Sequence, residues 1–119
     1  MKKYKPQNTG FFAKVYALVE QIPPGKVMTY GQISHMLKRP HGAKFVGFAM
    51  ASAPDHAGLP CHRVVNRLGG MAPGMIFGGE AVQREKLAAE GVPFLENGRV
   101  DLAEALFDPG EIKDKEKGQ

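Results

Sequence analysis

Residues 29–51 read TYGQISHMLKRPHGAKFVGFAMA. Thr29 and Gln32 have the spacing of a capping box, in which the hydroxyl and the amide each accept a hydrogen bond from a free backbone N–H at a helix start. A turn at residues 39–42 follows, and then a second helix from Ala43 to Ala51. Two short helices joined by a tight, glycine-containing turn indicate a helix-turn-helix. The apolar positions of the first helix form the stripe that we expect to be buried: Ile33, Met36 and Leu37.

The second helix has an unusual face. Lys44, Gly47 and Ala51 are spaced i, i+3 and i+7, so they lie on one side of the helix. One cation and two very small residues allow another surface to approach the helix backbone closely. That surface could be a nucleic-acid groove or a neighbouring helix, and spacing alone leaves both interpretations open.

Working outward, an apolar helical period precedes these helices between Phe11 and Ile22, with Asn8 or Thr9 as its cap and residues 23–25 as its end. A short extended piece, residues 27–28, leads into the capping box. After the helix-turn-helix we expect a strand at 62–65, a turn at 66–70 and a long glycine-rich loop. A helix at 80–90 with a Glu80–Arg84 pair should follow. The chain should then form a hairpin turn at Asn97–Gly98 and a last short helix capped by Asp101.

The 119 residues predict one domain, mainly α with a small β component, over residues 1–107, and a polar tail at 108–119. No run is long and apolar enough to span a membrane, and the basic N-terminus lacks the apolar core of a secretory signal. A single cysteine cannot form an internal disulfide, so we expect a cytoplasmic protein with a reduced thiol. We also expect a monomer.

The charge is unevenly distributed. Residues 1–100 hold 13 Lys and Arg against 6 Asp and Glu, a net charge of +7, whereas residues 101–119 hold 3 against 6, a net charge of −3. A basic body suits a polyanion such as nucleic acid, although many basic proteins bind none.

The segment from Pro60 to Val64 contains the cysteine, Cys61, followed by His62 and Arg63. Neighbouring cations favour the thiolate, which is the nucleophilic form. The alternative is a buried cysteine that packs as a small hydrophobe. No local signature supports a cysteine protease, and the four histidines show no paired spacing typical of a metal site, so we predict no metal.

Glu90 is placed in the last turn of its predicted helix, where the negative end of the helix dipole disfavours a carboxylate. Such a local inconsistency sometimes marks a functional residue. A solvated glutamate at a helix end is the other interpretation.

The PCHRVV stretch at 60–65 resembles the active-site motif of the O6-alkylguanine-DNA alkyltransferases. Residues 22–33, IPPGKVMTYGQI, resemble the segment that leads into that family's helix-turn-helix, and residues 43–50 resemble its recognition helix. Residues 78–79 and 86–92 resemble its later loop and helix. The resemblance covers roughly residues 11–95.

The resemblance implies a winged helix-turn-helix that binds duplex DNA through the minor groove and flips an alkylated guanine out of the stack. Cys61 would accept the alkyl group irreversibly and without a cofactor, His62 would deprotonate it through a water, and Glu90 would orient and charge His62. The other implied site residues fall into two sets. The DNA-binding set is Tyr30, which helps to rotate the target phosphate, with Lys44, Gly47, Ala51 and Arg63; the lesion-pocket set is Pro60, Val64, Ile76, Phe77 and Gly78.

The chain departs from the family pattern at four positions. Lys44 stands where the family usually has an arginine, whose planar guanidinium stacks and bridges as an ammonium does not. Ala53 aligns with a hinge asparagine. Ile76 and Phe77 align with a tyrosine and a serine of the lesion loop.

Three classes of function therefore compete. The first is alkyl transfer to Cys61. The second is lesion sensing without transfer, as in the similarly short alkyltransferase-like proteins, which usually have tryptophan in place of the cysteine and recruit excision-repair proteins. The third is a winged-helix regulator, which would need neither the Cys61-His62 pair nor Glu90.

Overall fold

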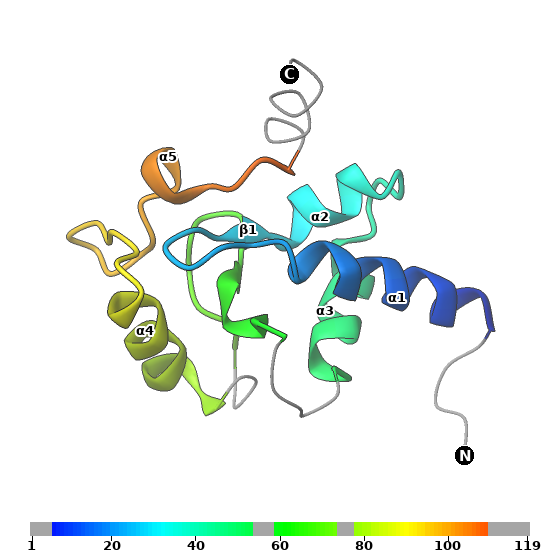
Figure 1. Ribbon diagram of the computed structural model, residues 1–119, viewed down its shortest axis with the longest axis horizontal. Coiled ribbons are helices and arrows are strands. Elements are labelled where there is room, and N and C mark those ends of the chain that lie inside the picture. The colour runs from blue at the N-terminus through cyan, green and yellow to red at the C-terminus, as the bar shows by residue number, and fades with distance from the viewer. Residues whose placement is uncertain (1–5, 54–58, 74–77, 110–119) are drawn as a thin grey trace.

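The computed structural model describes residues 6–53, 59–73 and 78–109, so Ile76, Phe77 and residues 110–119 of the predicted tail lie outside the described residues. The described part is mainly helical around one small sheet (Figure 1). The elements in chain order are α1 (Pro6–Val19), β1 (Met28–Thr29), α2 (Tyr30–Met36), α3 (Ala43–Ala51), the 3₁₀ turn η1 (Cys61–Arg63), β2 (Val64–Val65), α4 (Glu80–Ala89) and α5 (Leu102–Ala105). None of the helices in these ranges has the length and apolar character that crossing a bilayer requires.

The capping box at the start of α2 is confirmed. The Gln32 backbone N–H donates to Thr29 Oγ1 at 3.0 Å, and the Thr29 N–H donates to Gln32 Oε1 at 3.1 Å. The Gln32 amide nitrogen also donates to the Phe107 carbonyl at 2.6 Å. Gln32 therefore caps α2 and also ties the C-terminal segment to the helix-turn-helix.

The predicted buried stripe of α2 is partly wrong. Ile33 is fully buried and Leu37 is partly buried, but Met36 is exposed. Ser34 is buried instead, because its hydroxyl donates to the Arg39 carbonyl at 2.9 Å and so fastens the helix to the following turn.

The turn between α2 and α3 is fixed by a stacked cation. The Arg39 guanidinium lies 4.7 Å from the centre of the Phe11 ring and 4.6 Å from that of Phe45. Each contact is a cation–π interaction, in which the planar guanidinium stacks on the face of the aromatic ring. Arg39 therefore joins α1 to α3 across the turn.

The small sheet separates two hydrophobic cores. β1 and β2 pair in parallel, with Met28 beside Val64 and Thr29 beside Val65. Because side chains alternate along an extended chain, Met28 and Val64 pack among α1, α2 and α3, whereas Val27 and Val65 pack against α4 and the C-terminal segment. The segment before α2 and the segment after η1 are thus held side by side, as Figure 1 shows.

Several expected boundaries are corrected. α1 begins at Pro6, so neither Asn8 nor Thr9 is its cap; proline suits a first helical position because it lacks an N–H. The first strand lies one residue later than expected, at Met28–Thr29, and the second is Val64–Val65, because residues 61–63 form the 3₁₀ turn.

The C-terminal third matches its predictions with two exceptions. The Asn97–Gly98 hairpin is confirmed by an antiparallel bridge between Phe94 and Val100. Asp101 occupies the N-cap position of α5, but its side chain makes no capping hydrogen bond. Arg84 donates to the Gly98 carbonyl at 3.4 Å rather than pairing with Glu80.

Candidate active site and nucleic-acid interface

Cys61 opens η1 at the point where the chain enters the sheet. Its backbone N–H donates to the Leu59 carbonyl at 2.8 Å, and the Arg63 N–H donates to the Pro60 carbonyl at 3.0 Å. The Cys61 side chain is partly buried against the core formed by α1, α2 and α3. The backbone of this tight turn is thus fixed by hydrogen bonds on both sides of Cys61, whose side chain is partly exposed.

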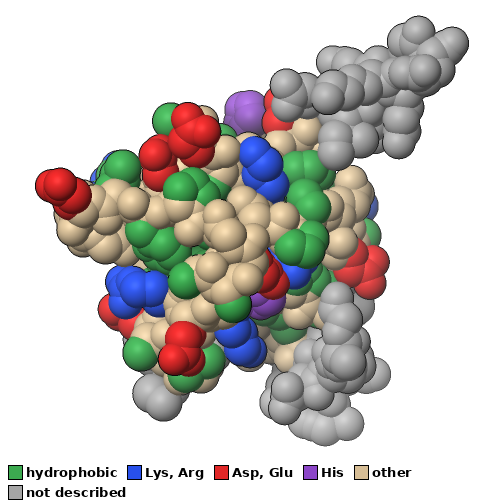
Figure 2. All heavy atoms as spheres, turned by 60° about the vertical axis from the view of Figure 1, so that its left-hand side comes forward, with side chains coloured by type: hydrophobic (Ala, Val, Ile, Leu, Met, Phe, Trp, Pro, Cys, Tyr) green, Lys and Arg blue, Asp and Glu red, His purple; other side chains and the backbone are tan. Residues whose placement is uncertain are grey.

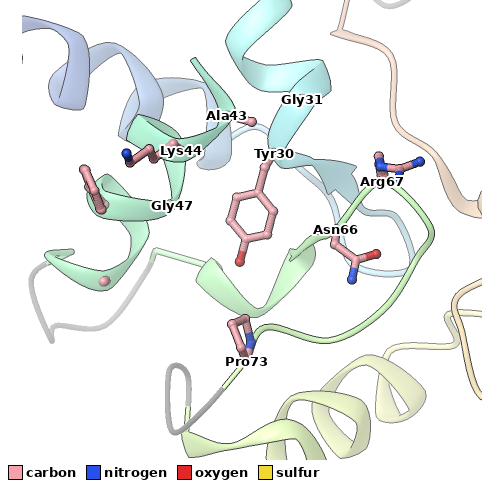
Figure 3. A pocket seen from close by; sticks show the side chains of 10 residues that line it. Tyr30, Gly31, Ala43, Lys44, Gly47, Asn66, Arg67 and Pro73 are labelled. Atoms are coloured by element: carbon pink, nitrogen blue, oxygen red, sulfur yellow. The ribbon is translucent and has the colours of Figure 1, made fainter. Parts of the chain in front are cut away.

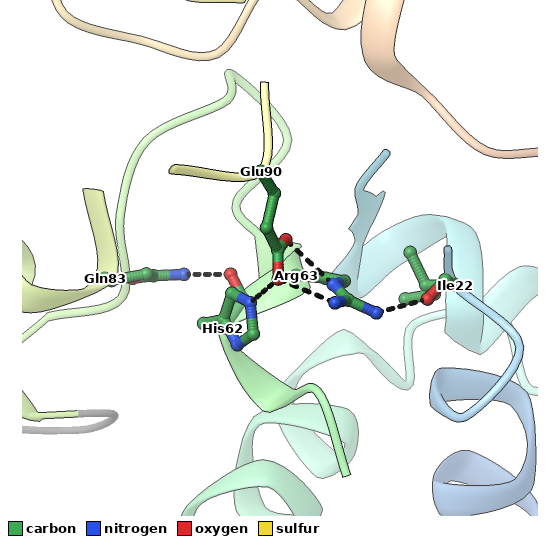
Figure 4. A network of polar contacts seen from close by, with 5 residues as sticks. All are labelled: Ile22, His62, Arg63, Gln83 and Glu90. Carbon is green, nitrogen blue, oxygen red and sulfur yellow. Dashed lines mark hydrogen bonds and ion pairs between the residues drawn. The ribbon is translucent and has the colours of Figure 1, made fainter. Parts of the chain in front are cut away.

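His62 and Arg63, which follow Cys61 in the chain, form one polar network with Glu90 (Figure 4). The His62 Nε2 atom lies 2.9 Å from Glu90 Oε2. Arg63 binds the same carboxylate with two nitrogens, Nε to Oε1 at 2.9 Å and Nη2 to Oε2 at 2.6 Å, and its Nη1 donates to the Ile22 carbonyl at 2.7 Å. A bidentate guanidinium–carboxylate pair is short, strong and geometrically defined, so the Glu90 carboxylate is held in place against the His62 ring.

The end of α4 explains how a carboxylate is kept at an unfavourable position. Glu90 is the C-cap of α4, and Gly91 follows with a φ of 88°. The Val92 N–H donates to the Leu87 carbonyl and the Gly91 N–H to the Ala88 carbonyl, which together form a Schellman motif. Hydrogen bonds from Arg63 lower the pKa of Glu90, against the opposing effect of burial, and His62 lowers it further. The predicted inconsistency at Glu90 is thus resolved by its partners.

The expectation that neighbouring cations favour the Cys61 thiolate is wrong for this resting structure. Burial raises the pKa of Cys61, and the opposing effects of its own backbone hydrogen bond and of Lys86 are smaller. Arg63 has no part in this, because its guanidinium is bound to Glu90. Burial, and secondly the neighbouring Cys61, also raise the pKa of Tyr30 to about 12. Both groups are therefore neutral near pH 7, and the thiol needs a base before it can react.

This raised pKa predicts slow chemical modification at neutral pH. The rate of Cys61 alkylation by iodoacetamide should rise with pH and reach its midpoint above the ordinary thiol pKa of about 8.5, because the thiolate is the reacting form. Mass spectrometry of samples quenched at intervals across pH 6–10.5 measures this (roughly the range that brackets a thiol pKa). A midpoint at or below the ordinary value would contradict the assignment of a desolvated thiol.

Gln83 is a part of the site that the sequence did not reveal. Its side chain is fully buried, and its amide nitrogen donates to the carbonyls of His62 and Val64, each at 3.0 Å. Its Oε1 atom accepts the Ala72 N–H at 2.8 Å. Gln83 therefore fastens η1 and β2 to α4 and to the following loop. A glutamine on an amphipathic helix looks like any solvated residue, and only its place on the helix face that carries Leu87 hinted at burial.

The second part of the site is a cavity of about 670 Å³ beside α3. Tyr30 stands in its centre, with Lys44 and Gly47 of α3 on one side and Asn66 and Arg67 on the other (Figure 3). The remaining lining residues are Gly31, Ala43, Phe48, Ala51 and Pro73. The predicted face of Lys44, Gly47 and Ala51 and the predicted Tyr30 are thus brought together in one hollow.

The small-residue face of α3 is open. A Cβ atom added at Gly47 would meet no atom within 4 Å, and Lys44 and Ala51 are exposed. The alternative of close packing against a neighbouring helix is therefore wrong within the described ranges. The face remains free for a partner from outside.

The other predicted residues are placed as follows. Val64 is fully buried in the core, Pro60 is partly buried, and Gly78 is exposed with a φ of 89°. The three nitrogens of the Arg63 guanidinium donate to Glu90 and to the Ile22 carbonyl. Ala53 is partly buried after α3. Over residues 6–53, 59–73 and 78–109, no group of three His, Cys, Asp or Glu side chains could hold a metal ion.

Comparison with known proteins shows the class. The chain matches the model of the 6-O-methylguanine DNA methyltransferase DNA-binding domain over residues 10–92. It is 36% identical over 100 residues to a DNA base-flipping protein of Vibrio parahaemolyticus, covering 83% of this chain and 97% of that protein. It is also 36% identical over 103 residues to alkyltransferase-like protein 1 of Schizosaccharomyces pombe, covering 83% and 95%. A methylated-DNA–protein-cysteine methyltransferase of Shigella flexneri is 44% identical over 64 residues, which are 54% of this chain and 37% of that enzyme.

Solved structures agree. Schizosaccharomyces pombe Atl1 in complex with damaged DNA containing O6-carboxymethylguanine matches with a TM-score of 0.73 and 36% identity, over 85% of this chain and 97% of that one. Mycobacterium tuberculosis OGT in complex with DNA matches with a TM-score of 0.62 and 31% identity, over 68% and 48%. The fold and the site thus define a winged helix-turn-helix DNA-binding domain. The chain belongs to the 6-O-methylguanine DNA methyltransferase family, through that family's DNA-binding domain.

Proposed function

We propose that this protein binds O6-alkylguanine in duplex DNA through the minor groove, flips the base and transfers the alkyl group irreversibly to Cys61. The observation that carries the proposal is the hydrogen bond of 2.9 Å between His62 and Glu90, next to the chain's single cysteine. A carboxylate that orients a histidine beside a thiol is the arrangement by which nucleophiles are activated. The proposed reaction requires neither metal nor cofactor.

The contact between Glu90 and His62 indicates which ring nitrogen takes the thiol proton. Glu90 binds His62 at Nε2, so Nδ1 is the ring atom left to take the Sγ proton, through a water. The thiolate then attacks the alkyl carbon, a sulfur–carbon bond forms, and the carbon–oxygen bond of the lesion breaks. The electron pair goes to guanine O6, and the proton taken from the thiol ends on the departing guanine. A thioether does not release its alkyl group, so each molecule reacts once.

DNA binding is assigned to the open face of α3. Gly47 and Ala51 would let the groove approach the helix backbone, and Lys44 would supply a cation. We assign to Tyr30, which lines the same cavity, the task of helping to rotate the flipped nucleotide's phosphate. We assign Arg63 to holding Glu90 instead of to contacting DNA, because its guanidinium is bound inside the protein.

The second candidate is a lesion sensor that binds alkylated DNA without transfer and recruits excision-repair proteins. One observation favours it: burial raises the pKa of Cys61, so the thiol is not activated at rest. The relatives that this chain nearly spans are a base-flipping protein and an alkyltransferase-like protein. The retained cysteine and its ordered histidine favour transfer.

The fate of the lesion separates the two candidates. A duplex with one O6-methylguanine is incubated with excess protein, digested, and its nucleosides are separated by chromatography. Transfer converts O6-methylguanine to guanine, whereas a sensor binds the duplex and leaves the lesion intact. Cys61→Ser is the control, because it keeps a small side chain and removes the sulfur nucleophile.

The open face of α3 gives a prediction with an internal control. Gly47→Leu should leave the fold intact, because an added side chain meets open space, but should weaken binding to alkylated duplex by at least about tenfold, since the groove can no longer reach the backbone. Gly10→Leu on α1 is the matched control, because Gly10 is also a helical glycine with open space around it. Thermal unfolding and fluorescence anisotropy are measured for both. Equal binding by the two variants would remove α3 from the interface.

A further inference from the structure

Phe48 is a large apolar residue that is exposed to solvent. Its side chain is 48% exposed, although it lies on α3 and lines the cavity beside Tyr30 and Lys44. It was not among the residues that the sequence marked for function. Phe48 is four residues after Lys44, so the ring and the ammonium group lie one helical turn apart on the same side of α3.

The ring is held by its neighbours. Phe48 packs edge-to-face on Phe45, with ring centres 5.7 Å apart and planes at 85°. Phe45 in turn is stacked on the Arg39 guanidinium, which also lies against Phe11. This chain of flat groups, running from α1 through the turn to α3, supports an exposed aromatic ring from behind. A supported ring loses little conformational freedom when a partner covers it.

The charge around the ring points to the kind of partner. The lining of the cavity includes the cations Lys44 and Arg67 and no carboxylate. On the face that carries α4 and α5, basic and acidic side chains are interspersed (Figure 2). An apolar ring flanked by cations, next to an uncovered helix backbone at Gly47, fits the minor groove of DNA, where apolar wedges enter between bases and cations meet phosphates.

We propose that Phe48 is a base-contacting residue, whose ring inserts at the base step beside the cavity and stacks on the base opposite the flipped nucleotide. Lys44 offers a charge but no flat surface, whereas the Phe48 ring offers a flat surface and no charge. The two residues therefore divide the task of filling the space that a flipped base leaves. This inference rests on the proposed binding of alkylated duplex.

The test uses duplexes with a single O6-methylguanine placed opposite 2-aminopurine, a base whose fluorescence falls when it is stacked. Cys61→Ala serves as the parent so that the lesion is not consumed, and Phe48→Leu and Phe48→Tyr are made in it. Phe48→Leu should weaken lesion binding roughly 5- to 100-fold, the range of one base–aromatic stacking contact, and should leave 2-aminopurine brighter in the saturated complex. Phe48→Tyr keeps the ring and should retain both the affinity and the quenching.

The control is Leu95→Ala, which removes a side chain that is 46% exposed on the hairpin segment away from α3. It should bind like the parent, and thermal unfolding verifies that each variant is folded. If Phe48→Leu matches the parent in affinity and in fluorescence, the proposal is overturned while the proposed function stands. If the parent itself does not prefer the alkylated duplex to an unmodified one, the proposed binding function is overturned, and the role of Phe48 with it.

Discussion

Replacing Glu90 by glutamine should slow methyl transfer by about 10²–10⁴-fold, the range that general-base assistance contributes. Glutamine keeps the size of the side chain but removes the charge that Arg63 and His62 bind at 2.6–2.9 Å. The His62 ring would lose its charged partner, and a neutral amide holds the ring less firmly in the position to take the thiol proton. Because burial raises the pKa of Cys61 and so favours the neutral thiol, weaker help from His62 should lower the rate. The rate is measured in single-turnover experiments with methylated duplex.

Two further variants show which contact of Glu90 matters. Glu85→Gln changes an exposed glutamate of the same helix and should leave the rate unchanged. Arg63→Lys keeps a cation beside Glu90 but loses the bidentate contact. The loss in the free energy of unfolding should therefore exceed the rise in the activation free energy of transfer. Raising the pH should partly rescue Glu90→Gln, since hydroxide ionises the thiol without His62. An unchanged transfer rate in Glu90→Gln would indicate that Glu90 is only a solvated glutamate at the end of a helix.

Replacing Gln83 by leucine should lower the free energy of unfolding by about 3–9 kcal/mol, because it leaves three buried groups without a hydrogen-bond partner and each costs about 1–3 kcal/mol. Leucine is of similar size and apolar, so the cost arises from three stranded groups: the carbonyls of His62 and Val64 and the N–H of Ala72. A domain of this size has only about 5–15 kcal/mol in total. Urea unfolding followed by circular dichroism measures the change.

Gln21→Leu is the matched control, because Gln21 is exposed after α1 and should tolerate the same substitution within about 0.5 kcal/mol. Gln83→Glu keeps the acceptor for Ala72 but sets a carboxylate oxygen against two carbonyls, so it should also destabilise the protein. Should Gln83→Leu unfold like the unmodified protein, the buried amide would not be what fastens η1 to α4.

The helix-turn-helix could be predicted from sequence because its signals are local. The capping box at Thr29 and Gln32 and the bounds of α3 depend on residues that are neighbours in the chain, and both predictions are confirmed. The same holds for the Asn97–Gly98 hairpin, where the turn residues decide the geometry. The exposure of Met36 and the burial of Ser34 were missed because periodicity treats every apolar residue as buried and does not encode the Ser34 hydrogen bond to the Arg39 carbonyl.

The site was only partly predictable, because its contacts join distant segments. Cys61 and His62 are adjacent in the sequence, but Glu90 reaches His62 from another element. Without the family resemblance, the sequence shows Glu90 only as a carboxylate at an unfavourable helix end. The state of the thiol was mispredicted because adjacency in sequence suggested that Arg63 acts on Cys61, whereas its guanidinium turns to Glu90 and Ile22. Gln83 carries only a weak signal, its place on the helix face of Leu87, and the sequence gives Phe48 no role of its own within residues 43–51, since burial and exposure on a helix are decided by the tertiary structure.

The central claim is that Cys61 is an alkyl acceptor activated by His62 and Glu90, and intact-protein mass spectrometry tests it most directly. The protein is mixed with an excess of duplex carrying O6-methylguanine and sampled over time, and the modified peptide is then mapped. The account predicts a gain of one methyl group per molecule, located on Cys61, with no second addition and with a slower gain in Glu90→Gln. Tight binding of the duplex with no gain of mass over hours would contradict the account and leave the lesion-sensor function in its place.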